Sequence, residues 1–338
     1  MAERRCTDAR WRVAVVIVAA AVVLASTGRA QDEGRIYFTR AGEGQSHIYS
    51  IRPDGSDDTR LTHDEDMWHN MPAASPDGRQ LALRWNTPDF AVSGIAVMSH
   101  TGSGLHMVVD RGQQPAWSPD GLRLAYVCFP DRGQRDLCLA NTDGNGVTIL
   151  TRDEWDDQSI AWAPDSRRIA FSSNRDPAFW LAPRGPNAAL TSDIYTMDVA
   201  SGETVNLTRT LDHEGEPAWS PDGRSVAFSR GVFGTASLHT LNVETGRERQ
   251  LVGPEMDSHF PAWSPDGSRV LFTSFADVSL YIVDRNGDRL TRLTTNGAVD
   301  HVWFRATWAS RDWSLAVSRS GRSVTTWAGL RANRTRGR

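Results

Sequence analysis

The sequence predicts an all-β fold, a six-bladed β-propeller whose blades are four-stranded antiparallel sheets. The first observation is a repeat: PAWSPDGLRLAYVC at 115–128 returns as PAWSPDGRSVAFSR at 217–230. The second is its period, because the marker positions of successive copies are 43, 45, 57, 44 and 45 residues apart, namely Asp77, Asp120, Asp165, Asp222, Asp266 and the matching Arg311. A period near 45 is typical of propeller blades. The third is that each period holds about four strand-like segments separated by turns.

Each copy of the repeat predicts a β-hairpin. In the copy at 217–230, Ser-Pro-Asp-Gly is turn chemistry, and Val226 and Phe228 then alternate with smaller residues as in a strand. SLHTLNV at 237–243 and the turn ETGR at 244–247 follow, before a fourth strand. The remaining copies are PAASPDGRQLALRW at 72–85, IAWAPDSRRIAFSS at 160–173, PAWSPDGSRVLFTS at 261–274 and the decayed ATWASRDWSLAVSR at 306–319.

Two recurring positions predict how the blades pack. A tryptophan recurs at one position of the first strand, and a small residue recurs at one position of the second strand. Large side chains that face small ones let neighbouring sheets interdigitate. The tryptophans are Trp117, Trp162, Trp219, Trp263 and Trp308, with Ala74 as the exception. The small residues are Ala82, Ala125, Ala170, Ala227 and Ala316, with Leu271 as the exception. We therefore interpret these tryptophans as core and not as a ligand cage.

The two ends of the chain predict how the ring closes. The segments RIYFTR, QSHIYSI and TRLT match the second to fourth strands of a blade, and ATWAS near the C-terminus supplies a first strand. If that strand completes the N-terminal sheet, six blades form a closed ring without exposed sheet edges. SLAVSR and SVTTWAG remain as an extra hairpin, so seven blades are the alternative. The predicted domains are the propeller over 31–319 and a basic, mobile tail over 320–338.

The N-terminus predicts export. Four arginines precede an apolar run from Val13 to Ala25, and Gly28 and Ala30 stand three and one residues before Gln31. This layout is typical of a secretory signal peptide over 1–30, and it places the mature chain in the periplasm or outside the cell. The run is shorter than the roughly 20 apolar residues that a bilayer core requires, so stable membrane insertion is not expected after cleavage. An uncleaved anchor is the alternative.

Two cysteines remain after the predicted signal. Cys128 and Cys138 lie near the facing ends of two adjacent predicted strands. An oxidising compartment permits a disulfide between them. Two buried free thiols are the alternative, because cysteine packs well as a small apolar residue.

The repeat PAWSPDG followed by a β-branched and aromatic strand resembles the WD-type repeat of the TolB-like β-propellers of bacterial envelopes, over roughly residues 34–319. The resemblance implies a partner-binding propeller in the cell envelope. The first strand begins close to the predicted cleavage site, so the small α/β domain that precedes the propeller in TolB is expected to be absent. Similar propellers cap serine peptidases of the prolyl oligopeptidase type, but no G-x-S-x-G motif occurs here.

The loops from the fourth strand of one blade to the first strand of the next are predicted to form the functional face. They are rich in carboxylates, histidines and aromatic residues, and they emerge on the same face as the loops between second and third strands. The candidates are Asp66, Trp68, His69, Asp110, Trp155, Asp156, Asp157, Asp212, His213, Glu214, Glu216, Asp257, His259, Phe260, Asp300 and His301. The long insertion at 174–192 adds Phe179 and Trp180, which either anchor a ligand or fold back onto their own blade.

This composition favours a non-catalytic scaffold that binds a protein or peptide partner, with a basic patch as the complement of the acidic face. The formal net charge of −4 gives no reason to expect nucleic-acid binding. No cofactor is predicted, no metal-binding motif such as H-E-x-x-H occurs, and a monomer is favoured. The alternative is a metal-dependent lyase or hydrolase with histidines and carboxylates at the channel mouth. Ordinary polar loops without any ligand are the third interpretation.

Overall fold

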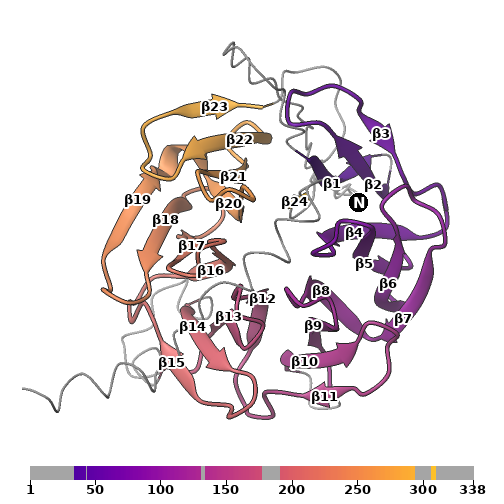
Figure 1. Ribbon diagram of the computed structural model, residues 1–338, viewed down its shortest axis with the longest axis horizontal. Coiled ribbons are helices and arrows are strands. Elements are labelled where there is room, and N and C mark those ends of the chain that lie inside the picture. The colour runs from indigo at the N-terminus through magenta and orange to yellow at the C-terminus, as the bar shows by residue number, and fades with distance from the viewer. Residues whose placement is uncertain (1–33, 43, 131–133, 177–190, 294–305, 310–338) are drawn as a thin grey trace, which may run out of the picture.

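The computed structural model describes residues 34–42, 44–130, 134–176, 191–293 and 306–309. Within these residues, 24 strands form six four-stranded antiparallel sheets arranged as a ring (Figure 1). The prediction of a six-bladed propeller is confirmed. The predicted signal segment and tail, together with Phe179, Trp180, Asp300 and His301, lie outside the described residues.

In every blade the first strand lies at the channel and the fourth strand lies at the rim (Figure 1). Blade 1 contains β24 (Thr307–Ala309), β1 (Arg35–Gly42), β2 (Gln45–Ile51) and β3 (Thr59–Arg60). Blade 2 contains β4 (Trp68–Ala74), β5 (Gln80–Asn86), β6 (Ser93–Ser99) and β7 (His106–Asp110). Blade 3 contains β8 (Gly112–Trp117), β9 (Arg123–Cys128), β10 (Asp136–Asn141) and β11 (Thr148–Ile149).

The second half of the ring repeats this plan. Blade 4 contains β12 (Asp157–Trp162), β13 (Arg168–Ser173), β14 (Asp193–Asp198) and β15 (Thr204–Asn206). Blade 5 contains β16 (Glu214–Trp219), β17 (Ser225–Arg230), β18 (Ser237–Asn242) and β19 (Glu248–Val252). Blade 6 follows the short 3-10 helix η2 (Pro254–Met256) and contains β20 (Ser258–Trp263), β21 (Arg269–Ser274), β22 (Ser279–Asp284) and β23 (Leu290–Arg292). No helix in the described part of the chain is long and apolar enough to cross a bilayer.

The ring closes through a sheet built from both halves of the chain. Strand β24 pairs antiparallel with β1, and Trp308 lies opposite Ile36 in the register. The predicted completion of the N-terminal sheet by the decayed repeat is therefore confirmed. Closure gives each of the six blades a neighbouring blade on both sides.

The turn between the first two strands of each blade is held by its own side chains. In blade 3 the Ser118 hydroxyl donates to Asp120 over 2.5 Å, and the Arg123 amide donates to the Ser118 hydroxyl over 2.9 Å. Gly121 has a φ of 74°, a left-handed conformation in which glycine carries no steric penalty. In blade 4 the sequence has Ser166 at this place, with a φ of 56°.

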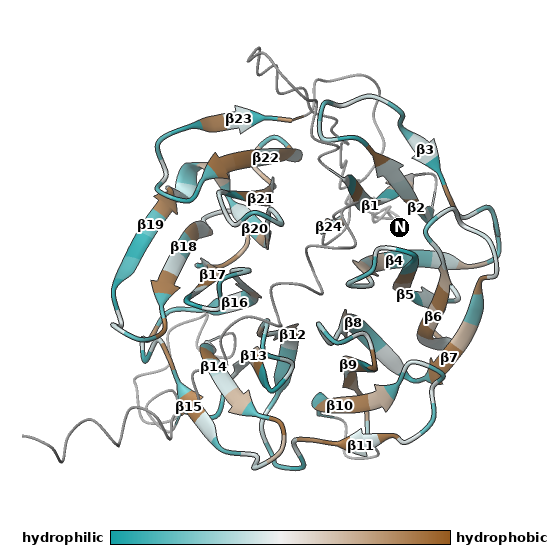
Figure 2. Cartoon of the chain, viewed as in Figure 1, coloured by the Kyte–Doolittle hydropathy of each residue, from teal (hydrophilic) through white to brown (hydrophobic). Residues whose placement is uncertain are grey.

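The core lies in six apolar layers, one between each pair of neighbouring blades. Between blades 5 and 6, for example, Ala227 and Leu238 pack against Trp263 and Phe272. Figure 2 shows that hydrophobic residues are concentrated in the strands, whereas the connecting loops are mainly hydrophilic. Each blade is too thin to bury apolar surface alone, so its stability depends on its neighbours.

The repeated tryptophans join neighbouring blades, as predicted. Trp117, Trp162, Trp219 and Trp263 are each at least 92% buried, with 7–8% of their surface exposed. The indole N–H of Trp162 donates to the backbone carbonyl of Ala116 in the preceding blade over 3.2 Å. Trp219 is the exception, because its indole nitrogen has no hydrogen-bond partner among the described residues.

A disulfide joins Cys128 and Cys138 across β9 and β10, with their Cα atoms 5.9 Å apart. Both residues belong to the apolar layer between blades 2 and 3. The bond therefore ties the second and third strands of blade 3 together inside the core.

The environments of Trp162 and Trp219 predict that substitutions at the two positions lower the free energy of unfolding by different amounts. Trp162→Phe and Trp219→Phe remove the same atoms, and an arginine stacks on each indole at 4.9 and 5.0 Å. Only Trp162→Phe also loses an inter-blade hydrogen bond. We expect Trp162→Phe to lower the free energy of unfolding by about 1 kcal/mol more than Trp219→Phe does, measured by urea unfolding followed by circular dichroism. Equal losses in the two variants would contradict this role of the indole N–H.

Candidate functional site

The candidate site lies on the face formed by the loops between second and third strands and the loops between blades, which we call the mouth face. Contacts between the two sets of loops hold this face together. The Trp68 indole N–H donates to the carbonyl of Gly44 over 2.7 Å, and Trp68 packs edge-on against Phe90. Arg135, before β10, forms an ion pair with Asp156, before β12, at 2.6 Å.

A β-bulge recurs at one position in the first strand of five blades, where the pairing with the second strand shifts register. The residue in each bulge has a left-handed φ of 53–59° although it is not glycine, and these residues are Met71, Gln114, Ser159, Glu216 and Phe260. A bulge bends the strand and redirects a side chain. All five residues line a small cavity of about 20 Å³ at the channel.

Hydrogen bonds from blade to blade support these strained residues. The Gln114 side chain accepts from the Ser159 amide over 2.7 Å, and the Glu216 carboxylate accepts from the Phe260 amide over 2.7 Å. A bulge side chain of one blade thus binds the bulge backbone of the next. Because the strain recurs and has partners, the channel wall is a rigid frame for the residues above it.

Next to Glu216, a buried histidine lies between two carboxylates. The Nδ1 atom of His259 is 3.3 Å from Glu216 Oε2, and its Nε2 atom is 3.2 Å from Asp257 Oδ1. Burial lowers the pKa of His259, but Glu216 and Asp257 outweigh it, so the net shift is upward. Asp257 also accepts the Ala236 amide over 3.0 Å, which fixes its orientation.

Three phenylalanines surround this histidine. Phe233 stacks on the His259 ring with centroids 4.5 Å apart, and 66% of its surface is exposed. Phe275 and Phe260 lie 5.1 and 6.0 Å from the same ring. We call Glu216, Asp257, His259 and the three phenylalanines the aromatic cluster. Sequence reasoning found His259 and Phe260 but missed Phe233 and Phe275, which lie in loops between second and third strands, outside the repeated motif.

Three of the acidic candidates have arginine partners, which the sequence alone did not reveal. Asp156 pairs with Arg135, Asp157 with Arg175 and Glu214 with Arg230. Other candidates, Asp66, Asp110 and Asp212, are exposed. The mouth face is therefore less negative than a count of its carboxylates indicates.

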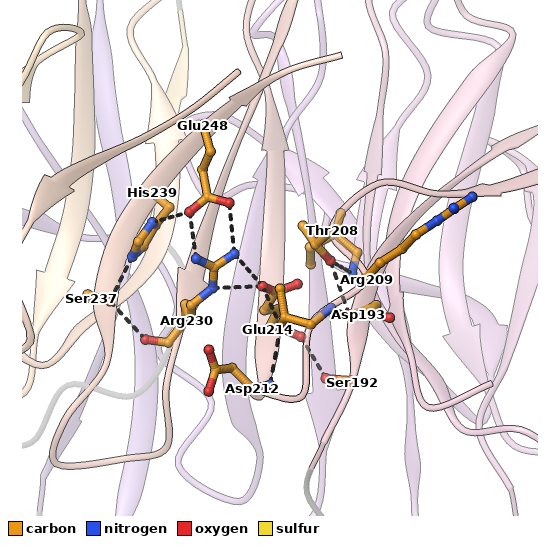
Figure 3. A network of polar contacts seen from close by, with 12 residues as sticks. Ser192, Asp193, Thr208, Arg209, Asp212, Glu214, Arg230, Ser237, His239 and Glu248 are labelled. Atoms are coloured by element: carbon orange, nitrogen blue, oxygen red, sulfur yellow. Dashed lines mark hydrogen bonds and ion pairs between the residues drawn. The ribbon is translucent and has the colours of Figure 1, made fainter. Parts of the chain in front are cut away.

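Glu214 is the centre of a polar network between blades 4 and 5 (Figure 3). Arg230 donates to Glu214 over 2.7 Å and to Glu248 over 2.5 Å, and so links the first and fourth strands of blade 5. Burial raises the pKa of Glu214 to about 7, although Arg230 opposes the shift. His213, the neighbouring candidate, lies 3.0 Å from the hydroxyl of Ser192. These residues hold two blades together at the mouth face.

The same network places Ser237, His239 and Glu248 in the order of a hydrolase triad (Figure 3). His239 lies 2.8 Å from the Ser237 hydroxyl and 2.8 Å from Glu248. However, Ser237 is only 8% exposed and its hydroxyl also lies 3.1 Å from the Arg230 carbonyl. The arrangement orients a buried imidazole and does not present an exposed nucleophile.

His69 and His47 form a second histidine environment, between blades 1 and 2. Their rings are 5.8 Å apart, and Arg60 lies 2.9 Å from His47. His69 is fully buried, and neither of its ring nitrogens has a hydrogen-bond partner among the described residues. Burial, followed by the nearby His47, lowers the pKa of His69 to about 4.

Among the described residues, the structure does not bring the candidate histidines together as ligands of one metal ion. His69 lies in β4 of blade 2 and stacks on His47 of blade 1, His213 directly precedes β16 of blade 5, and His259 lies in β20 of blade 6. In the described part of the chain, one group of three acidic or histidine side chains has ligand atoms within 4.8 Å of one another, and it consists of Asp136, Asp153 and Asp157.

No family model matches the chain. It is 32% identical over 117 residues to the uncharacterized peptidase YuxL of Bacillus subtilis, covering 33% of this chain and 16% of that protein. It is 30% identical over 152 residues to a TolB homolog of Chlorobium luteolum, covering 44% of this chain and 34% of that protein. The crystal structure of TolB from Acinetobacter baumannii matches with a TM-score of 0.67 at 19% identity, covering 83% of this chain and 67% of that one. The matched stretches thus span less than half of these curated relatives.

The environment of His69 predicts a loss of stability in acid. The folded protein keeps this imidazole neutral down to about pH 4, whereas the unfolded chain binds the proton near pH 6.5. The unfolded state therefore gains protons first, and the free energy of unfolding should fall by up to about 3 kcal/mol as the pH drops from 6.5 to 4. Urea unfolding of His69→Gln should show a smaller slope across this window, while His100→Gln, at an exposed site, should retain it. The same slope in His69→Gln as in the unsubstituted protein would refute the assignment.

Proposed function

Because the chain folds as a TolB-like six-bladed β-propeller, we propose that it is an exported, non-catalytic scaffold that binds a protein or peptide through its mouth face. The observation that carries this proposal is the aromatic cluster. Phe233 is 66% exposed at the channel mouth and is stacked on an imidazole that two carboxylates hold in place. An exposed aromatic ring on a rigid support is typical of a binding hot spot.

The chemistry of the cluster favours a partner with a basic residue. Two carboxylates and one histidine carry a net negative charge in either protonation state of the imidazole. Arginine and lysine side chains also bind to the faces of aromatic rings, which Phe233, Phe260 and Phe275 offer close by. A basic side chain flanked by apolar residues could therefore contact both the rings and the carboxylates.

The proposed location is the cell envelope or the space outside the cell. Two features support it: the signal-like N-terminal segment, and the disulfide between Cys128 and Cys138, a bond that persists in oxidising compartments. The similarity to TolB proteins agrees with this location.

A peptide-display selection tests the binding surface. The chain from Gln31 onward should select peptides that contain arginine or lysine beside apolar residues. Phe233→Ala should weaken the selected peptides at least tenfold, because it removes the exposed ring of the cluster. Leu122→Ala is the matched control, since Leu122 is 67% exposed in the turn between the first two strands of blade 3, on the opposite face.

Affinities should be measured by isothermal titration calorimetry. Glu216→Gln should also reduce the salt dependence of binding, because it removes a charge from the cluster. Selection of no peptide, or equal binding by Phe233→Ala and Leu122→Ala, would overturn the proposed surface.

A further inference from the structure

Arg84, in β5 of blade 2, is a half-buried arginine that has no carboxylate partner in the described part of the chain. Its side chain donates to the Ser93 hydroxyl over 3.4 and 3.5 Å, which is long for an N–H···O bond. Asp89, the nearest acid along the chain, accepts instead from the Thr87 hydroxyl and the Ala91 amide. Burial lowers the pKa of Arg84, but a guanidinium keeps its charge at any ordinary pH. The positive charge is therefore left without a partner.

Other arginines at the mouth face show what Arg84 lacks. Three of them lie near the mouth-face ends of second strands, stack on an aromatic ring and also bind a carboxylate. The pairs are Arg40 with Asp58, Arg175 with Asp157 and Arg230 with Glu214. Arg84 stacks in the same way on Phe90, with its guanidinium carbon 5.1 Å from the ring centroid. A guanidinium presents a planar fork of donors that matches a carboxylate, so Arg84 has the capacity to bind one more.

The repeat does not account for an arginine at this position. Arg84 is the thirteenth residue of its copy, and the side chain there is uncharged and buried in the four complete copies that follow. Those residues are Val127, Ser172, Ser229 and Thr273. Ala82, on the same face of β5, packs in the layer between blades 2 and 3, so Arg84 lies at the mouth-face end of that layer. A residue that departs from the rule of its repeat indicates a local function.

Phe90 is held in an exposed position beside this guanidinium. It is 52% exposed and has a φ of 59°, a left-handed conformation that is unfavourable for a bulky side chain. Its amide donates to the Thr87 carbonyl over 2.9 Å, and Trp68 packs edge-on against its ring at 5.7 Å. The ring would therefore shield an ion pair formed by Arg84 from water, which strengthens the attraction between the two charges.

Arg84 lies across the channel from the aromatic cluster. Blades 2 and 3 are opposite blades 5 and 6 in the ring (Figure 1). The aromatic cluster combines Phe233 of blade 5 with His259 of blade 6, and it carries the carboxylates of Glu216 and Asp257. The mouth face thus has a negative group on one side of the channel and an unpaired positive group on the other.

We propose that Arg84, beside Phe90, binds a carboxylate of the same peptide partner whose basic residue contacts the aromatic cluster. This inference rests on the proposed function, and it adds the second charge of the partner and the direction in which the partner crosses the mouth face. The carboxylate belongs to an Asp or Glu side chain or to the C-terminus of the partner, since both offer two oxygens to a guanidinium.

Titration with small carboxylates tests the Arg84 site without any peptide partner. N-acetylglutamate α-amide supplies a side-chain carboxylate, and N-acetyl-leucine supplies a C-terminal one. The NMR signal of the Trp68 indole N–H, assigned with Trp68→Phe, reports binding because Trp68 packs against Phe90. We expect at least one of the two probes to shift this signal, and the uncharged N-acetylglutamine α-amide to leave it in place. A signal that neither carboxylate moves would overturn the site.

Three variants make this titration specific. Arg84→Gln should weaken the active probe at least tenfold, because binding loses hydrogen bonds between charged groups. Arg84→Lys should weaken it less, since lysine keeps the charge but not the planar fork, and it keeps the test valid if Arg84→Gln does not fold. Arg79→Gln removes an exposed arginine at the opposite end of the same hairpin and should change nothing. Equal affinity in Arg84→Gln and the unsubstituted chain would refute the role of Arg84.

Peptides selected on the mouth face test whether one partner reaches both sites. Replacing the acidic residue of such a peptide by its amide, or amidating its C-terminus, should weaken binding to the unsubstituted chain about tenfold. The same change should have no effect on binding to Arg84→Gln, as a double-mutant cycle requires. Peptides that depend on Phe233 but bind Arg84→Gln equally well would overturn this inference and leave the proposed function intact. If no peptide is selected, the proposed function fails, whereas the titration still decides whether Arg84 binds a carboxylate.

Discussion

Contact between neighbouring blades is the interaction on which the rest of the structure depends. A four-stranded sheet has two faces, and each of the six apolar layers covers one face of two blades at once. No blade is stable without its neighbours, so the ring must close. Closure rests on three residues of β24, on the register of Trp308 with Ile36, and on the Arg269 guanidinium that lies 5.4 Å from the Trp308 ring.

The repeated bulge explains how a structural repeat supports a specific site. The bulge fixes the backbone at the channel in the same way in five blades, yet it places Met71, Gln114, Ser159, Glu216 or Phe260 at equivalent positions. In blade 5 this residue is the carboxylate Glu216, and in blade 6 it is the aromatic Phe260. Both lie beside the buried His259. The backbone geometry at the bulge is therefore common to the five blades, whereas the side chain that it presents differs from blade to blade.

The sequence predicts the fold well because the signals for it are local. The Ser-Pro-Asp-Gly turn is held by contacts within six residues, as Ser118, Asp120 and Arg123 show. The site is harder to predict, because the partners of its charges come from other loops. Arg135 is 21 residues from Asp156, and Arg175 is 18 residues from Asp157. Phe233 stacks on a histidine 26 residues later, and no spacing in the repeat marks that contact.

The residue two positions before each bulge residue shows that some buried residues of this ring are not explained by stability alone. This position holds His69, Gly112, Asp157, Glu214 or Ser258, and all five are buried. Apolar residues in place of a buried ion pair are often neutral or stabilising, so stability alone does not explain Asp157 with Arg175 or Glu214 with Arg230. Both pairs lie where a loop between blades enters the ring. Asp157 also lies near Asp136 of the preceding blade, and Glu214 accepts a hydrogen bond from Thr210 of the connecting loop. These polar contacts specify how the mouth loops are seated, and the loops so positioned carry the residues that a partner can reach.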